Sequence, residues 1–256
     1  MNIKHMQENW NKWGETDPLY AILTYPQKQG GKWQLEEFFE TGTREINDVL
    51  SYVKGLGIPV PRRRALDFGC GVGRLTQALA RYFNEVCGVD VAPSMIEWAQ
   101  KYNCCGDRCL YFMNASDDLA IFPNDHFDFI YTNITLQHIE PHYSQRYIEE
   151  FCRVLAPQGV LIFQLPIPGL AKAPVAERVK CFIPYPIRIP LLSLYRLLRY
   201  GDLHGRPYPR IETYPIKRES VLALLRRCCM KVLDIKQSAD AGPGCKAFWY
   251  CVTREY

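Results

Sequence analysis

The order of apolar and polar positions along the chain predicts short buried strands that alternate with amphipathic helices. In the central part of the chain, largely apolar runs lie at 64–68, 85–90, 109–113, 128–132 and 160–165. Runs of this kind are typical of strands in a parallel sheet, because such strands are buried on both faces. Between the runs, apolar residues recur every three or four positions, as they do after Arg74 and after Pro93, which predicts helices. This alternation indicates an α/β domain.

The two ends of the chain extend this pattern. A helix predicted to end near Arg227 is followed by apolar runs at 231–235 and 247–253, which predict two closing strands. The N-terminal segment is rich in aromatic side chains, and the apolar positions between Leu35 and Val53 predict an amphipathic helix. We therefore divide the chain into four parts: 1–61 as a helical N-terminal cap or lid, 62–165 as the core, 166–214 as an insertion, and 215–256 as the remainder of the core.

Composition and charge add limits to this picture. The chain has 256 residues, of which 48% are hydrophobic and 23% charged, as is ordinary for a globular protein. Its net charge of +4 is not gathered into a basic tract, so we expect no nucleic-acid partner. The N-terminus is polar and no apolar run has the length of a membrane helix, so we expect a cytoplasmic protein without stable membrane insertion. The 11 cysteines show no C-x-x-C spacing, which predicts reduced thiols and no metal site.

The most informative stretch is the glycine-rich turn that follows the first central strand. Gly69, Gly71 and Gly73 alternate there, and a helix is predicted to begin at once. Glycines at this spacing let the backbone turn sharply and approach a ligand, and the helix N-terminus offers unpaired N–H groups. The dinucleotide fingerprint G-x-G-x-x-G does not fit, because Arg74 or Thr76 occupies the third glycine position in the two registers.

Two acidic residues frame this turn. Asp67 lies on the strand before it, and Asp90 ends the next strand, about twenty residues further on. An acid at the tip of that second strand is suited to bidentate hydrogen bonding of ribose hydroxyls. The stretches LDFGCGVGRLT and EVCGVDVAPSM resemble motif I and the following acidic strand of the class I methyltransferases that use S-adenosylmethionine (SAM).

The resemblance extends to 126–139, which is similar to motif IV of that family, and to the closing strands. It implies a Rossmann-like α/β fold with a seven-stranded, mostly parallel sheet, an antiparallel last strand and an insertion after the fifth strand. It also implies that SAM is the cofactor. In the family an acidic residue usually follows the third strand, whereas Asn114 stands there in this chain. The residues that the resemblance assigns to the cofactor are Asp67, Gly69, Cys70, Gly71, Gly73, Asp90, Val91, Met95, Asn114, Ala115, Ser116, Asn133 and Ile134.

His138 is the candidate catalytic residue, because it follows the fourth central strand. Parallel α/β sheets bind their ligands at the carboxyl ends of the strands, and a neutral imidazole there could take a proton from a hydroxyl. The alternative is a histidine that hydrogen-bonds its own loop and orients it. Related sequences that methylate unlike substrates also have a histidine here, which favours the structural role.

Two segments are candidates for enclosing a substrate. We expect Trp13, Tyr20 and Trp33 of the N-terminal cap to contact it, because an aromatic cover would exclude water and present π faces to a sulfonium. From the insertion we expect His204 and Tyr208. The insertion is rich in proline and contains a basic amphipathic stretch; a roof over the substrate is favoured over a homodimer contact, and a membrane-surface helix is least favoured.

The resemblance implies methyl transfer, and the short chain, mild charge, aromatic lid and apolar insertion favour an oxygen or nitrogen of a small, partly hydrophobic metabolite as the acceptor, as in natural-product biosynthesis. Such a transfer can depend on proximity in a dry site, with a general base as an option. Methylation of tRNA or of a protein is an alternative, although the chain shows no coherent basic face or added binding domain for it. A scaffold that binds SAM without catalysis is a second alternative. The glycine spacing disfavours an NAD-dependent oxidoreductase.

Overall fold

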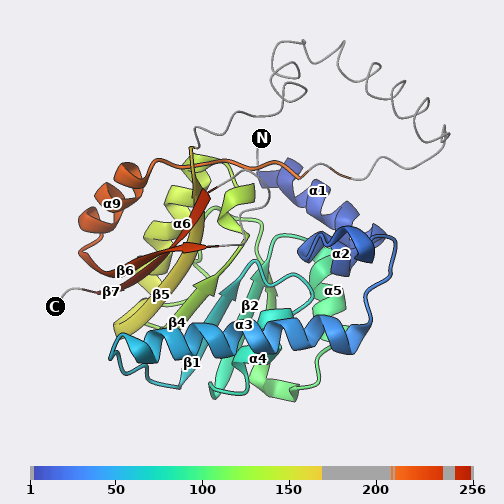
Figure 1. Ribbon diagram of the computed structural model, residues 1–256, viewed down its shortest axis with the longest axis horizontal. Coiled ribbons are helices and arrows are strands. Elements are labelled where there is room, and N and C mark those ends of the chain that lie inside the picture. The colour runs from blue at the N-terminus through green and yellow to red at the C-terminus, as the bar shows by residue number, and fades with distance from the viewer. Residues whose placement is uncertain (1–2, 169–208, 210, 239–245, 255–256) are drawn as a thin grey trace, which may run out of the picture.

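The computed structural model describes residues 3–168, 209, 211–238 and 246–254 (Figure 1). Seven strands form one sheet in the order β3-β2-β1-β4-β5-β7-β6. Their bounds are β1 (Arg64–Phe68), β2 (Glu85–Asp90), β3 (Cys109–Met113), β4 (Phe127–Thr132), β5 (Leu155–Ile167), β6 (Met230–Ser238) and β7 (Lys246–Arg254). β7 runs antiparallel to β5 and β6, and the other neighbouring strands are parallel. The sheet with its antiparallel last strand confirms the predicted fold class.

The fifth strand is longer than the apolar pattern indicates. Leu155 already pairs with Phe127, and the next paired residues are Val160 and Phe129. The stretch between them, which the composition predicts to be a turn, forms an irregularity inside β5, with Gln158 at a φ of 64°. These turn-like residues therefore interrupt the strand and do not precede it.

Helices cover both faces of the sheet (Figure 1). α3 (Leu35–Gly55) and α4 (Arg74–Leu79) pack on one face, and α6 (Pro141–Val154) and α9 (Arg218–Arg227) pack on the other. The remaining described helical segments are α1 (Ile3–Thr16), α2 (Pro18–Ile22), α5 (Pro93–Lys101) and the 3₁₀ turns η1 (Pro26–Lys28), η2 (Gly106–Arg108) and η3 (Leu136–His138). None of the helices in the described ranges is long and apolar enough to cross a membrane.

The core lies in two layers, because β5 and its neighbours bury both of their faces. Leu161 and Phe163 pack on the side of α6, whereas Val160 and Ile162 pack on the side of α3. All four side chains are fully buried. This alternation explains why the strand reads as a continuous apolar run.

The N-terminal helix α1 is fastened to α5, beside the carboxyl ends of β1 and β2 (Figure 1). The backbone N–H and the hydroxyl of Ser94 both donate hydrogen bonds to Asn11, each at 2.9 Å. Trp98 Nε1 donates to the carbonyl of Gly14 at 3.1 Å. A Cβ on Gly14 would collide with the Ser94 side chain, so the glycine permits this close approach.

The chain leaves β5 and returns to the sheet at neighbouring points. Ile216 N–H donates to the carbonyl of Pro166 at 3.0 Å, and Tyr214 N–H donates to the carbonyl of Gln137 at 2.7 Å. The returning segment therefore lies against η3. Most of the expected insertion lies outside the described residues, and so do its predicted substrate contacts His204 and Tyr208.

Candidate functional site

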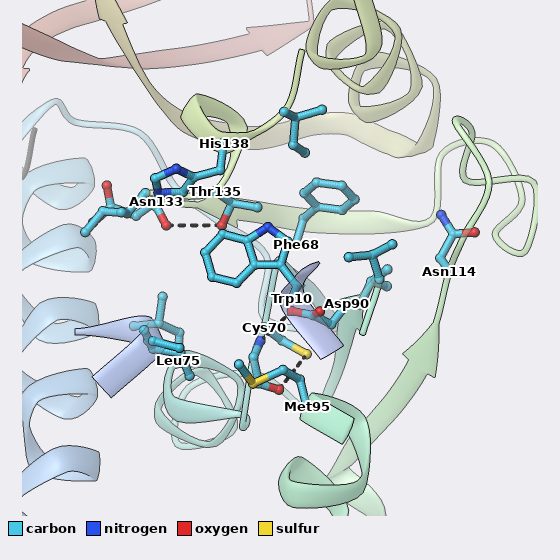
Figure 2. A pocket seen from close by; sticks show the side chains of 18 of the residues that line it. Trp10, Phe68, Cys70, Leu75, Asp90, Met95, Asn114, Asn133, Thr135 and His138 are labelled. Carbon is cyan, nitrogen blue, oxygen red and sulfur yellow. Dashed lines mark hydrogen bonds between the residues drawn. The ribbon is translucent and has the colours of Figure 1, made fainter. Parts of the chain in front are cut away.

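A cleft of about 950 Å³, its open mouth included, lies at the carboxyl ends of β1, β2 and β4 (Figure 2). The cleft is largely apolar, and its polar lining is concentrated in a few side chains and in the glycine loop. Figure 2 shows side chains from several elements converging on the cleft, among them Trp10, Phe68, Asp90 and His138.

The glycine loop between β1 and α4 forms one wall of the cleft. Gly69, Gly71 and Gly73 have φ values of 77°, 52° and 82°, which are costly for other residues. A Cβ on Gly69 would collide with the side chain of Thr135, and one on Gly71 would crowd Ile22. The loop therefore needs glycine for its backbone angles and also for the close approach of the segments around it.

Asp67 lies behind this loop and is not among the residues that line the cleft. It is 1% exposed, and the hydroxyl of Thr76 donates to its Oδ2 at 2.6 Å. Burial raises the pKa of Asp67 to about 7. In this structure the carboxyl group ties the start of α4 to β1, so its predicted role toward the cofactor would be exerted through the position of the loop.

Asp90 ends β2 and lines the cleft. Its two carboxylate oxygens each accept a backbone N–H at 2.9 Å, one from Gly71 and one from Ala92. Burial raises the pKa of Asp90. Each carboxylate oxygen has a second lone pair, so the group can still accept hydrogen bonds from a vicinal diol. A fixed carboxylate beside a glycine loop fits the ribose of SAM.

Asn114 follows β3 and borders the cleft together with Val91 and Met95. Its Nδ2 donates to the carbonyl of Asp118 at 2.8 Å, and its Oδ1 accepts the N–H of Ser116 at 3.3 Å. Apolar side chains and a fixed amide in the same cleft lining fit the needs of a purine ring. Two other residues predicted for this end, Ala115 and Ser116, are exposed and do not line the cleft, so the structure brings only part of the predicted set together.

The loop after β4 contributes Asn133 and Ile134 to the cleft, as predicted from the sequence. Ile134 has a φ of 59°, a left-handed conformation that is rare for a β-branched residue. Thr135 Oγ1 donates to the carbonyl of Asn133 at 3.2 Å across this turn. Strained backbone of this kind is concentrated at ligand sites.

A partly buried polar cluster behind this loop is not predicted from the sequence. Glu45 of α3 accepts hydrogen bonds from Arg74 Nη2 at 2.7 Å, Tyr131 Oη at 2.9 Å and Asn133 Nδ2 at 2.9 Å. Trp249 Nε1 of β7 donates to Asn133 Oδ1 at 3.2 Å. Glu45 and its partners are far apart in the sequence, and nothing in their spacing signals that they meet.

His138 lines the cleft and is held inside a hydrogen-bond chain. Its Nδ1 lies 2.6 Å from the carbonyl oxygen of Glu212, and its Nε2 lies 3.0 Å from Nε2 of Gln137. Because a carbonyl only accepts, Nδ1 carries the proton, and Nε2 accepts from the Gln137 amide. Burial lowers the pKa of His138, which favours this neutral form. Both ring nitrogens of His138 are therefore engaged in hydrogen bonds to other protein groups.

The aromatic residue that the N-terminal cap brings to the cleft is Trp10, whose ring lies 5.4 Å from that of His138. The three predicted aromatics do not line the cleft. Trp13 is buried, as is Trp33, which donates to the carbonyl of Leu23, and Tyr20 lies 6.3 Å from Trp13. The helical spacing of Met6, Trp10 and Trp13 places these three side chains on one face of α1, and this spacing could have identified Trp10 from the sequence. Met6 also lines the cleft, so the first half of this stripe faces it.

Comparisons with known proteins agree with this geometry. Residues 66–163 match a family described as methyltransferase domain. Trans-aconitate 2-methyltransferase of Methylobacterium radiotolerans is 36% identical over 132 residues, which are 50% of this chain and 46% of that protein. Malonyl-[acyl-carrier protein] O-methyltransferase of Halorhodospira halophila is 32% identical over 116 residues, 41% of this chain and 36% of that protein. The chain thus spans less than half the length of these curated relatives.

The solved structures show the same fold over nearly the whole chain. Magnesium protoporphyrin IX methyltransferase from Synechocystis, with S-adenosylhomocysteine bound, has a TM-score of 0.62 at 17% identity, with 98% of this chain and 99% of that chain covered. A Leishmania major SAM-dependent methyltransferase has a TM-score of 0.61 at 13% identity and covers 96% of this chain and 82% of that chain. Residues 66–163 of this chain therefore match a methyltransferase domain, and the chain has the fold of these solved SAM-dependent methyltransferases.

Proposed function

We propose that the protein is an enzyme that binds SAM in the cleft and transfers its methyl group to an oxygen or nitrogen of a small, partly hydrophobic metabolite. The observation that carries this proposal is Asp90, whose carboxylate is fixed by the N–H groups of Gly71 and Ala92 beside the glycine loop. The matched methyltransferase domain supports the same reaction class. When bound, SAM supplies an electrophilic methyl group on a sulfonium.

In this proposal the chain binds, orients and excludes water. Asp90 holds the ribose, and the slot at Asn114 and Met95 holds the adenine. The apolar wall that includes Trp10 and Ile139 keeps water from the reacting atoms. Methyl transfer requires the acceptor to lie in line with the breaking bond at close range, so positioning of this kind can supply much of the rate enhancement.

His138 has a structural role in this proposal more readily than a catalytic one. To act as a base, its Nε2 would have to give up the hydrogen bond from Gln137, and its lowered pKa makes it a weaker base. Its bond to the Glu212 carbonyl instead orients the segment that returns to β6. We therefore propose that His138 positions the loop and that a general base is optional.

The class of acceptor is suggested by the relatives and by the cleft. Two relatives, the malonyl-[acyl-carrier protein] O-methyltransferase and the ubiquinone biosynthesis O-methyltransferase of Coxiella burnetii, are named for transfer to oxygen. The apolar lining of the cleft favours a metabolite with a hydrophobic part, for example a natural-product intermediate. We place the protein in the cytoplasm, without a nucleic-acid partner, and retain His204 and Tyr208 as substrate contacts.

Calorimetric titration with SAM, S-adenosylhomocysteine and NAD⁺ tests the cofactor. We expect both adenosyl ligands to bind and NAD⁺ not to bind. Asp90→Ala should weaken adenosyl binding by about 100-fold, because charged hydrogen bonds to the ribose are lost. Asp107→Ala removes an exposed carboxylate of η2 and is the matched control, with affinity unchanged.

Two results would contradict the proposal: no adenosyl binding by the wild-type protein, or tight binding of NAD⁺. If the adenosyl ligands bind, incubation with SAM and panels of hydroxyl and amine acceptors, read by mass spectrometry, tests turnover. A SAM-binding scaffold would bind SAM and transfer no methyl group to any acceptor. A tRNA or protein methyltransferase would instead label those macromolecules.

A further inference from the structure

Two thiols meet where the ends of α6 and α9 pack against each other. Cys152 lies in the last turn of α6 and is 6% exposed, whereas Cys228 directly follows α9 and is half-buried. Both side chains belong to the hydrophobic core on this side of the sheet, and their thiols form a hydrogen bond with each other. Neither residue lines the cleft, so this pair is separate from the proposed SAM site.

Further contacts at the same place hold the two helix ends together. Arg227, which precedes Cys228, pairs with Glu149 of α6 at 3.3 Å, and Glu149 lies one turn before Cys152. On the other side, Arg254 of β7 donates to the carbonyl of Cys152 at 2.7 Å. The approach of the two thiols is therefore part of a packed interface between α6, α9 and β7.

The two thiols are not equivalent. The hydrogen bond from Cys152 to the sulfur of Cys228 lowers the pKa of Cys228 to about 7; Arg227 acts in the same direction, whereas burial and Glu149 oppose it. The same hydrogen bond, together with burial, raises the pKa of Cys152. About half of the Cys228 side chains are therefore thiolates at pH 7, and the thiolate is the nucleophilic form of cysteine.

A second pair of thiols, Cys105 and Cys109 beside η2, is bonded differently. Cys105 Sγ lies 3.9 Å from the carbonyl oxygen of Gln77, and Cys109 Sγ lies 3.8 Å from that of Thr76. Because a carbonyl only accepts, each of these contacts holds the thiol in its protonated form. Burial raises the pKa of Cys109 to about 12. The pair at α6 and α9 is therefore the one prepared for nucleophilic attack.

We infer that Cys228 and Cys152 are a redox site that forms a disulfide by exchange with a low-molecular-weight disulfide and thereby fastens α9 to α6. The Cys228 thiolate attacks one sulfur of that disulfide, the other half leaves as a thiolate, and a mixed disulfide results. Cys152 then loses its proton to solvent and attacks the Cys228 sulfur, and the second half leaves as a thiolate. The protein pair is oxidised, and the small disulfide is reduced to two thiols.

Incubation of the full chain with oxidised glutathione, followed by non-reducing peptide mapping with mass spectrometry, tests the inference. The first cross-linked peptide should join Cys152 to Cys228, and dithiothreitol should reverse it. The free Cys228 thiol should disappear about fivefold faster at pH 7 than at pH 6 and only about twofold faster again at pH 8, because the thiolate fraction saturates above the pKa.

Two substitutions of Cys152 separate its two roles. Cys152→Ser keeps a hydrogen-bond donor but cannot form the disulfide, so the glutathione adduct of Cys228 should accumulate at close to the wild-type initial rate. Cys152→Ala also removes the donor and should slow this first step by about threefold at pH 7, since a smaller thiolate fraction is partly offset by greater nucleophilicity. Cys229→Ser, at the exposed neighbour, is the matched control and should leave the cross-link unchanged.

Three results would overturn the inference. A lasting glutathione adduct on Cys228 of the wild-type protein would show that Cys152 does not reach the mixed disulfide. A first cross-link between Cys105 and Cys109, or between Cys228 and Cys229, would place the redox site elsewhere. A Cys228 thiol that does not react would show that it is not a nucleophile. The experiment contains neither SAM nor an acceptor, so its result is independent of the proposed function.

Discussion

The two ends of the central strands differ in how completely their charged groups are paired and hydrogen-bonded. At the amino end of β4, Asp128 is 1% exposed, and its carboxylate is both hydrogen-bonded and paired with a cation. Its carboxylate accepts the backbone N–H groups of Arg63 and Arg64 at 2.9 and 3.1 Å and the Arg63 guanidinium at 2.7 Å. Burial acts to raise the pKa of Asp128, but the hydrogen bonds outweigh it, and the pKa is lowered.

At the carboxyl ends of the same strands, the charges and the backbone are less satisfied. Burial raises the pKa of Asp67 and of Asp90, Arg74 has a buried donor without a partner, and Ile134 has a left-handed backbone. The comparison teaches that one end of the sheet stabilises the fold, whereas the other holds groups that line the cleft, such as Asp90 and Arg74, whose missing interactions a ligand can supply.

The largest effect that sharpens this comparison is a dependence of stability on pH. The folded protein keeps the Asp67 proton to about pH 7, whereas an unfolded aspartate loses it near pH 3.9. Between these values the unfolded chain binds fewer protons, so the free energy of unfolding falls as the pH rises, by at most about 1.4 kcal/mol for each pH unit. Asp67→Asn should remove this slope, as measured by urea unfolding at several pH values.

The exposed substitution Asp107→Asn serves as the control for that series and should leave the slope unchanged. Asp128 should behave in the opposite sense, since its lowered pKa gives stability that is present above about pH 4 and lost as the pH falls further. An Asp67→Asn variant with the wild-type pH dependence would show that Asp67 is ionised in the folded protein.

The second largest effect is a loss of stability at the amino end of β4, without a loss of adenosyl binding. Asp128→Ala should lower the free energy of unfolding by about 3 kcal/mol, because two backbone N–H groups lose a charged acceptor. Adenosyl binding should stay within about twofold of wild type, since the residue lies at the far end of β4 from the cleft. Urea unfolding and calorimetry measure the two quantities. A loss of affinity as large as that expected for Asp90→Ala would break the distinction between the two ends.

The smallest effect is at Ile134. Asn tolerates a left-handed backbone, so Ile134→Asn should recover about 1 kcal/mol of strain and offset the lost apolar contacts, leaving stability within about 1 kcal/mol of wild type. Ile139 lines the same cleft with a φ of −107°, and the control Ile139→Asn should cost about 3 kcal/mol. Equal losses in thermal or urea unfolding would show that the backbone at Ile134 holds no strain.

The sequence was sufficient for the features that depend on local chemistry. The alternating glycines at Gly69 and Gly71 and the acid at Asp90 read as a cofactor loop, because neighbouring residues alone decide their backbone angles and their place at a strand tip. The apolar runs predicted all seven strands; the largest error is at the start of β5, where turn-like residues interrupt the strand, and β6 continues to Ser238 beyond its predicted end.

What sequence alone did not provide are contacts between distant segments. Glu45 reads as one more polar position of an amphipathic helix, and only the packing of α3 on the sheet brings it to Arg74 and Asn133. The partners of His138 are equally remote, since the Glu212 carbonyl lies 74 residues away. Trp10 lines the cleft and Trp13 does not, because the hydrogen bonds between α1 and α5 fix how α1 is rotated. The periodicity of the apolar positions does not determine this rotation.

The hydrogen bond between Ile216 and Pro166 has a consequence for how such a chain can change over evolutionary time. It joins the end of β5 to the segment that leads into α9. The two ends of the intervening segment are therefore held together whatever the length of that segment. The free energy of closing a loop rises only slowly with its length, by about 0.6 kcal/mol for each doubling. Segments of different length and composition can therefore be exchanged at this junction while the glycine loop and Asp90 stay as they are.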